Sequence, residues 1–278
     1  MSKNGKSTLT AGLLLTPPLA WLVVIYLASL AVMFVSAFWG VDSFTGRVVH
    51  IFTTDNFHQI FTDPLFRKVT LRTIGIALAV TAIDAVIALP LGLFMAKVAS
   101  PALRIALVVA VTTPLWASYL VKAYAFRGLL APGGPIDWVT GGHTTGYGIP
   151  AVIMTLAYLW LPYMVIPVFT AFEKVPDSLF EASSDLGATG WTTLRRIVAP
   201  IVFPGIAAGS IFTFSLTLGD YIAVTIVGGK TQMLGNVIYG QLVTANNQPL
   251  ASALAVVPLV LILLYLFGLR RTGALESL

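Results

Sequence analysis

The chain has 278 residues, of which 57% are apolar and only 10% are charged, and its mean hydropathy is +0.90. Soluble domains carry roughly 25% charged residues, so this composition excludes a soluble enzyme domain and a disordered chain. The lack of cysteine excludes disulfides and thiolate metal sites, and the net charge of +5 includes no basic run typical of nucleic-acid binding. We therefore predict a membrane protein with no metal site and no nucleic-acid partner.

Six stretches with few or no charges predict membrane-spanning helices, which gives an all-α fold in a single transmembrane domain over residues 1–278. In chain order they cover residues 13–38, 73–96, 105–120, 149–172, 201–219 and 250–269. A helix needs roughly 20 mostly apolar residues to cross a bilayer. The third stretch is the shortest, and it would extend to about Tyr124 if the Lys122 side chain reached the membrane surface.

An even number of spans places both termini on the same side of the membrane. Lysine and arginine are about twice as dense on that side as on the other, and such residues gather in cytoplasmic loops. We therefore expect cytoplasmic N- and C-termini. The loop at residues 173–200 then also faces the cytoplasm.

Two features inside the predicted spans lead to expectations about the structure. Asp84 is the one charge within residues 73–96, and a charge at a helix centre costs about 2.5–3.5 kcal/mol on insertion scales. Its side chain should therefore face protein or a water-filled path rather than lipid, either as a structural hydrogen-bonding group or as an attractor of cations. In the fifth span, Gly205 and Gly209 have the GxxxG spacing that permits close helix contact.

The loop at residues 173–200 predicts a short amphipathic helix. Ser178 and Glu181 have the spacing of a capping box, and Gly187 fits the position that ends such a helix. One face of this helix is apolar and another is acidic: Leu179, Ala182 and Leu186 against Asp177, Glu181 and Asp185. A connection between two spans needs only a few residues, so this layered pattern indicates a role beyond linking.

The same loop resembles the EAA loop of binding-protein-dependent ABC importer permeases, the inner-membrane subunits of type I importers. The family pattern is Glu-Ala-Ala, three residues, Gly, nine residues, and Ile-x-Leu-Pro. This chain has Glu181-Ala182-Ser183, then Gly187, then Ile197-x-Ala199-Pro200. It departs from the pattern at Ser183 and Ala199, and both replacements are small.

This resemblance implies a six-helix, MetI-like permease fold in the bacterial plasma membrane. It also implies that the loop forms a coupling helix on a cytoplasmic ATPase, through residues that match or adjoin the motif: Glu181, Ala182, Ser183, Asp185, Gly187, Ile197 and Pro200. The implied partners are a second homologous permease in a heterodimer, two copies of the ABC ATPase and an extracytoplasmic solute-binding protein. ATP and Mg would be used by the ATPase, so this chain would bind no cofactor and would not itself be an enzyme.

Looser similarities extend to the spermidine/putrescine-type permeases, in segments at residues 124–130, 219–229, 233–238 and 249–254. They imply a polyamine cargo, although relatives with similar segments carry opine, phosphonate, thiamine or ferric substrates. Carboxylates and aromatic rings both attract ammonium groups. The expected cargo path therefore comprises Asp220 and Tyr221, with Asp84 and the aromatic residues Trp116, Tyr119, Tyr124, Trp160 and Tyr163 as candidates. The same rings are also typical of an interfacial belt and of helix packing.

Three other interpretations are weaker. Gly228-Gly229-Lys230-Thr231 lacks the glycine of a nucleotide-binding P-loop, because Val224 stands five residues before the Gly-Lys pair. An intramembrane enzyme would need converging catalytic groups, whereas Asp84 stands alone in mid-span. An ion-coupled secondary transporter could use Asp84 as its ion site. Dependence of transport on an ATPase distinguishes that alternative from an importer permease.

Overall fold

The computed structural model describes residues 3–42, 44–144 and 146–270, with side chains from residue 14 onward. The regular structure in this part is helical, apart from a two-stranded antiparallel hairpin of β1 (Gly40–Val41) and β2 (Val48–Val49). Five long helices are apolar enough to cross a membrane: α1 (Lys3–Ser36), α3 (Pro64–Leu93), α7 (Ile149–Glu173), α10 (Ala199–Gly219) and α13 (Gln248–Leu269). The predicted all-α membrane fold is therefore confirmed.

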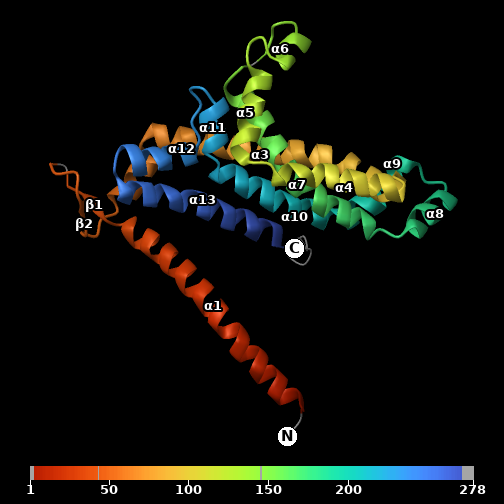
Figure 1. The fold of residues 1–278 in the computed structure, drawn as a ribbon, viewed down its shortest axis with the longest axis horizontal. Coiled ribbons are helices and arrows are strands. Elements are labelled where there is room, and N and C mark those ends of the chain that lie inside the picture. The colour runs from red at the N-terminus through yellow and green to blue at the C-terminus, as the bar shows by residue number, and fades with distance from the viewer. Residues whose placement is uncertain (1–2, 43, 145, 271–278) are drawn as a thin grey trace.

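Shorter elements join these helices. At one end of the bundle are η1 (Phe94–Val98), α8 (Asp177–Asp185), α9 (Gly190–Thr193) and η2 (Leu194–Val198), where η marks a π-helical turn. At the other end are α2 (Asp55–Thr62), α11 (Ile222–Val227), α12 (Leu234–Tyr239) and η3 (Gly240–Thr244). Figure 1 shows α8 and α9 at one end of the bundle, opposite α11, α12 and the β1–β2 hairpin.

Helix α3 begins nine residues before the predicted start of the second span at residue 73. Asp63 caps it, because its carboxylate accepts a hydrogen bond from the Leu65 amide, and Pro64 occupies the first helical position. Because Arg67, Lys68 and Arg72 are charged, hydropathy did not include this first part of the helix in the predicted span, although it is helical. The cap, rather than hydropathy, sets the beginning of this helix.

The prediction of one continuous third span at residues 105–120 is wrong. Helix α4 (Pro101–Trp116) ends four residues earlier, where Ala117 and Ser118 adopt extended backbone conformations. The chain then turns by 100° into α5 (Tyr119–Leu130), which continues toward α6 (Pro135–Val139). Ala123 and Leu130 of α5 are fully buried in an apolar cluster with residues of α7 and α11. Hydropathy detected this apolar segment, but packing on α7 and α11 determines its direction.

The centre of the bundle is formed by α3, α7 and α10, which pack along much of their length. The two glycines of the GxxxG pair lie against α7, as their spacing predicts. A Cβ atom on Gly205 would lie 2.5 Å from the Ala171 Cβ, and one on Gly209 would lie 2.7 Å from the Met164 Sδ. Glycine at both positions is therefore what permits the close approach of α10 to α7.

Helix α1 stands apart from this bundle (Figure 1). Only 6% of the most apolar stretch of this helix is buried. It joins the rest of the chain near its C-terminal end, where the Ser36 hydroxyl donates a hydrogen bond to the Ser252 hydroxyl of α13 at 2.9 Å. Most of the apolar surface of α1 is therefore available to lipid or to another subunit.

We expect Gly205→Val to destabilise the bundle, because the added side chain would force α10 away from α7. Overpacking of this kind costs about 1–3 kcal/mol. Thermal unfolding of the protein in lipid nanodiscs measures the effect. Gly75→Val on α3 is the matched control, since a Cβ at Gly75 meets no atom within 4 Å. Equal unfolding temperatures for the two variants would contradict the packing argument.

Candidate functional site

The loop between α7 and α10 contains the predicted amphipathic helix, as α8. The helix begins at Asp177 after Pro176, and no side chain caps its N-terminus. The predicted capping box of Ser178 and Glu181 is therefore wrong, because Ser178 lies inside the first turn rather than before it. Pro176, with its fixed backbone angle, is the N-cap residue, so the helix starts two residues too early for that box.

The C-terminal end of α8 follows the prediction for Gly187. This residue has φ +73°, a left-handed conformation that favours glycine. Two backbone hydrogen bonds close the end, from the Gly187 amide to the Ser184 carbonyl at 2.9 Å and from the Ala188 amide to the Ser183 carbonyl at 3.0 Å. This pair of bonds is the Schellman motif. A side chain at residue 187 would strain it.

Ser183, which departs from the family pattern, has a structural role. It is buried, and its hydroxyl forms a 2.7 Å hydrogen bond with the Thr193 hydroxyl of α9. Alanine could not form this bond. The replacement thus links the two short helices of the loop through a buried pair of hydroxyl groups.

The remaining motif residues lie at two places. Glu181, Ala182 and Asp185 are exposed on α8, and Leu186 just beyond it is 88% exposed. Ile197 lies in η2 and Pro200 in the first turn of α10, so they connect the loop to the bundle rather than forming the exposed face. The structure thus brings together the α8 residues and places the end of the motif at the start of a membrane helix.

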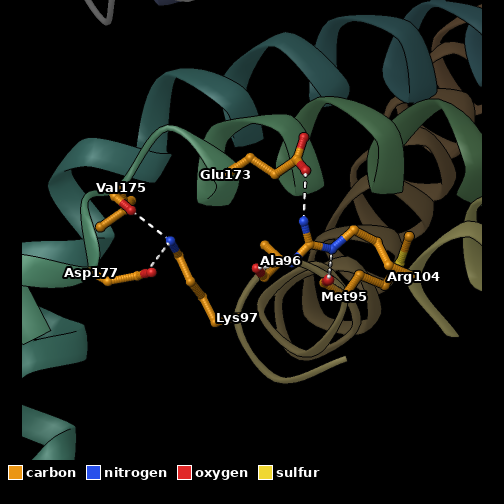
Figure 2. A network of polar contacts seen from close by, with 7 residues as sticks. All are labelled: Met95, Ala96, Lys97, Arg104, Glu173, Val175 and Asp177. Carbon is orange, nitrogen blue, oxygen red and sulfur yellow. Dashed lines mark hydrogen bonds and ion pairs between the residues drawn. The ribbon is translucent and has the colours of Figure 1, made fainter. Parts of the chain in front are cut away.

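Two basic residues that the sequence analysis counted only as positive charges hold this loop in place (Figure 2). Lys97 in η1 donates to the Val175 carbonyl at 2.6 Å and to the Asp177 carboxylate at 2.7 Å. Arg104 in α4 donates to the carbonyls of Met95 at 3.0 Å and Ala96 at 2.9 Å. It therefore satisfies carbonyl groups at the end of α3 and η1. In the sequence, the available signal was their position at the ends of predicted spans: Lys97 directly follows the second span and Arg104 directly precedes the third.

At the opposite end of the bundle, Asp220 lies where α10 breaks and α11 begins. One carboxylate oxygen accepts a hydrogen bond from the Ala223 amide at 3.0 Å, near the start of α11. The other accepts one from the Tyr119 hydroxyl, at the first residue of α5. The break between α4 and α5 and the break between α10 and α11 therefore meet at this one carboxylate.

A cavity of about 310 Å³ opens beside this carboxylate. It is lined by Tyr119, Trp160, Ser215, Leu216, Gly219, Asp220, Tyr221 and Ile222. The Trp160 Nε1 is buried and has no hydrogen-bond partner within the described part of the chain. Four of the predicted path residues thus line a single cavity, which combines a carboxylate with aromatic rings.

The aromatic rings continue inward from this cavity. Ring centroids of Trp160 and Tyr163 lie 6.0 Å apart, and those of Tyr163 and Phe212 lie 6.1 Å apart. Tyr221 stacks on Tyr239 at 5.0 Å. Phe212 and Tyr239 were not predicted, because nothing in the linear sequence places them beside the other rings.

The other four predicted path residues do not line the cavity, and one of them is Tyr163, whose ring lies beside that of Trp160. Trp116 at the end of α4 is 91% exposed, and Tyr124 on α5 is also exposed. Asp84 lies within α3 and is fully buried, with no hydrogen-bond partner for its carboxylate among the described residues. The prediction that Asp84 faces protein rather than lipid is confirmed.

Residues 88–271 match the family model described as the binding-protein-dependent transport system inner membrane component. The chain belongs to this family. The match contains the motif of residues 181–200, α8 and the residues that line the Asp220 cavity. It identifies the chain as an ABC importer permease subunit, a multi-pass protein of the bacterial inner membrane.

Individual relatives agree with this assignment. The inner membrane ABC transporter permease protein YdcU of Escherichia coli (strain K12) is 39% identical, over 96% of this chain and 90% of the relative. The spermidine/putrescine transport system permease protein PotB of the same strain is 31% identical, over 85% of this chain and 88% of the relative. Among solved structures, a chain of a bacterial alginate ABC transporter in complex with alginate pentasaccharide-bound periplasmic protein has a TM-score of 0.73 at 18% identity. It covers 97% of the permease and 96% of its own length, which shows the shared fold.

We expect Asp84→Asn to retain or raise the thermal stability of the permease. A buried carboxylate without a partner is destabilising, and the amide removes its charge at similar volume. Asp137→Asn is the control, because Asp137 accepts hydrogen bonds from the Gly133 and Thr144 amides and its replacement should lower stability. Thermal unfolding of both variants measures this. A lowered unfolding temperature for Asp84→Asn would mean that the carboxylate has a stabilising partner.

Proposed function

We propose that this permease subunit imports a small cationic amine, with spermidine or putrescine as the representative cargo. The observation that carries the proposal is the cavity beside Asp220, where a buried carboxylate lies among aromatic rings. The relative named as a spermidine/putrescine permease supports the same class of cargo, while the YdcU name specifies none.

The chemistry of the cavity suits a cargo that must be held weakly and released. The Asp220 carboxylate is already hydrogen-bonded by Tyr119 and by α11, so an ammonium group would have to share or replace the Tyr119 contact. Aromatic faces add roughly 0.5–2 kcal/mol by cation–π contact. The carboxylate contact and the cation–π contact thus each contribute modestly to binding, and a transport path needs modest affinity.

One observation favours a different cargo. The unpaired Trp160 Nε1 is a hydrogen-bond donor, and an ammonium group offers it no acceptor. An opine carries carboxylate groups as well as an amine, so it could use both this donor and the Asp220 carboxylate. Phosphonate, thiamine and ferric cargo remain further alternatives without a specific contact in their favour.

We also infer that α8 is the coupling helix for a separate ATPase, which would supply ATP hydrolysis with Mg. The support is the motif match, the ordered end at Gly187, and the exposure of Ala182 and Leu186 on the surface of the loop. We propose accordingly that the loop and both termini lie in the cytoplasm and that the Asp220 cavity opens at the outer side. There a solute-binding protein would deliver cargo. The bare surface of α1 supports pairing with a second permease subunit.

The cargo proposal predicts that Asp220→Asn lowers uptake of labelled spermidine by the assembled transporter. The amide keeps a hydrogen-bond acceptor for α11 but removes the charge that attracts an amine. A lost charge-assisted contact corresponds to about a tenfold change in apparent affinity. Tyr119→Phe is the control, because it removes the hydrogen bond to Asp220 and leaves the negative charge. Normal uptake by Asp220→Asn, with ATPase coupling intact, would remove the main support for a cationic cargo.

The coupling proposal predicts that Gly187→Val separates the ATPase from the permease or uncouples the two. Valine at a left-handed backbone position is strained by about 1–2 kcal/mol or more, so the end of α8 should reorganise. Gly190→Val is the matched control in the same loop, since Gly190 does not have a positive φ and a Cβ there meets no atom within 4 Å. Co-purification of the ATPase and transport-coupled ATP hydrolysis measure the effect. Normal values for Gly187→Val would exclude α8 as the coupling helix.

A further inference from the structure

The junction between α7 and α8 is fastened to the end of α3 by one side chain. The Lys97 ammonium group donates to the Val175 carbonyl, just before α8, and to the Asp177 carboxylate at its first residue (Figure 2). The Lys97 side chain is only 16% exposed, whereas that of Asp177 is 79% exposed. Lys97 therefore reaches from the bundle to a residue at the surface of the loop.

The contact extends beyond these two bonds. The Lys97 Nζ lies 5.9 Å from the centroid of the Phe180 ring, in the first turn of α8. Leu179 and Phe180 pack on the apolar cluster that contains Met95 and Ala96 of η1. The first turn of α8 is thus held to the end of α3 by charge, by hydrogen bonding and by apolar packing. The hydrogen bond between Ser183 and Thr193, by contrast, stays within the loop.

Arg104 makes the attachment point rigid. It donates to the carbonyls of Met95 and Ala96, and its guanidinium lies 3.5 Å from the Glu173 carboxylate at the end of α7 (Figure 2). The π-helical turn η1 interrupts the regular hydrogen-bond ladder just where Lys97 lies, and such turns leave carbonyl groups to be satisfied by other donors. The ends of α3 and α7 and the start of α4 therefore form one connected unit around Lys97.

Helix α3 also makes contact at the other end of the bundle. The Thr73 hydroxyl accepts a hydrogen bond from the Leu234 amide, at the first residue of α12, at 2.9 Å. Two residues later, the Asn236 side chain donates to the Tyr221 carbonyl at 2.9 Å. Tyr221 lines the cavity beside Asp220. One helix thus connects the loop at one end with the cavity wall at the other.

We propose that Lys97 is the positioning residue that makes α3 follow α8, so that a displacement of the coupling helix by the ATPase is transmitted to the cavity. This inference rests on the proposed coupling role of α8. Packed elements joined in this way move as rigid bodies, and loss of the joint would let α8 move alone. The ATPase would still bind, because Lys97 lies on the bundle side of the loop.

The test measures joint motion directly. The chain has no cysteine, so spin labels can be placed at Ser178→Cys on α8 and Val98→Cys on η1 in an otherwise unaltered protein. Both sites are exposed. In the complete transporter with its ATPase, the distance between the labels should be the same with and without ATP. In Lys97→Met, which keeps the aliphatic part of the side chain, the distance should change or broaden when ATP binds.

A second measurement is the stimulation of ATP hydrolysis by the loaded binding protein, with spermidine as the probe. Lys97→Met should reduce this stimulation about tenfold, as expected for loss of a partly buried charge-assisted bond, while ATPase co-purification stays normal. Lys97→Arg should restore both readouts. Lys174→Met is the matched control, because the Lys174 side chain is exposed and has no hydrogen-bond or ion-pair partner in the described ranges.

The outcomes separate this inference from the proposed function. An unchanged label distance in Lys97→Met, with normal stimulation, would overturn the role of Lys97 while a defective Gly187→Val still supported α8 as the coupling helix. Normal behaviour of Gly187→Val would refute α8 itself. If Lys97→Met fails to assemble, Asp177→Asn removes the same ion pair from its exposed side and should broaden the label distance in the same way. A distance unaffected in Asp177→Asn would then contradict the proposal.

Discussion

The structure depends on one constraint of the bilayer, which is that backbone polar groups must find partners within the protein. Regular helices satisfy this constraint along their length, so the backbone groups that need other partners are those at the ends of helices. At the break between α10 and α11, the Asp220 carboxylate accepts a hydrogen bond from the Ala223 amide. At the end of α3, the Arg104 guanidinium satisfies the carbonyls of Met95 and Ala96. Asp220 and Arg104 thus supply hydrogen bonds at helix ends, next to the two candidate sites.

Close packing determines how these two ends are related. Gly205 and Gly209 let α10 approach α7, and α3 packs against both, so the three helices form a rigid centre. The loop that contains α8 extends from one end of this centre, opposite α11 (Figure 1), and the Asp220 cavity opens beside the start of α11. A rigid centre suits a permease, because a small displacement at one end can reach the other without being absorbed between them.

The polar groups inside the bundle are few and differ in kind. The Thr81 and Thr213 hydroxyls lie 3.4 Å apart, between α3 and α10. Asp84, three residues along α3, has no partner in the described ranges. A buried carboxylate without a partner is costly, so Asp84 lowers the stability of the bundle in this state.

The sequence by itself determined the fold class, the positions of most membrane helices and the family, because hydropathy, Gly187 and the motif spacing are all local signals. Gly187 ends α8 as predicted, since a left-handed backbone position is a property of the residue itself. Tertiary structure decided what depends on contacts between distant segments. The Tyr119–Asp220 and Lys97–Asp177 hydrogen bonds join residues 80 or more positions apart, and the 100° turn after α4 is accompanied by packing of α5 on α7 and α11. No local pattern encodes these contacts, because they arise only when the helices pack.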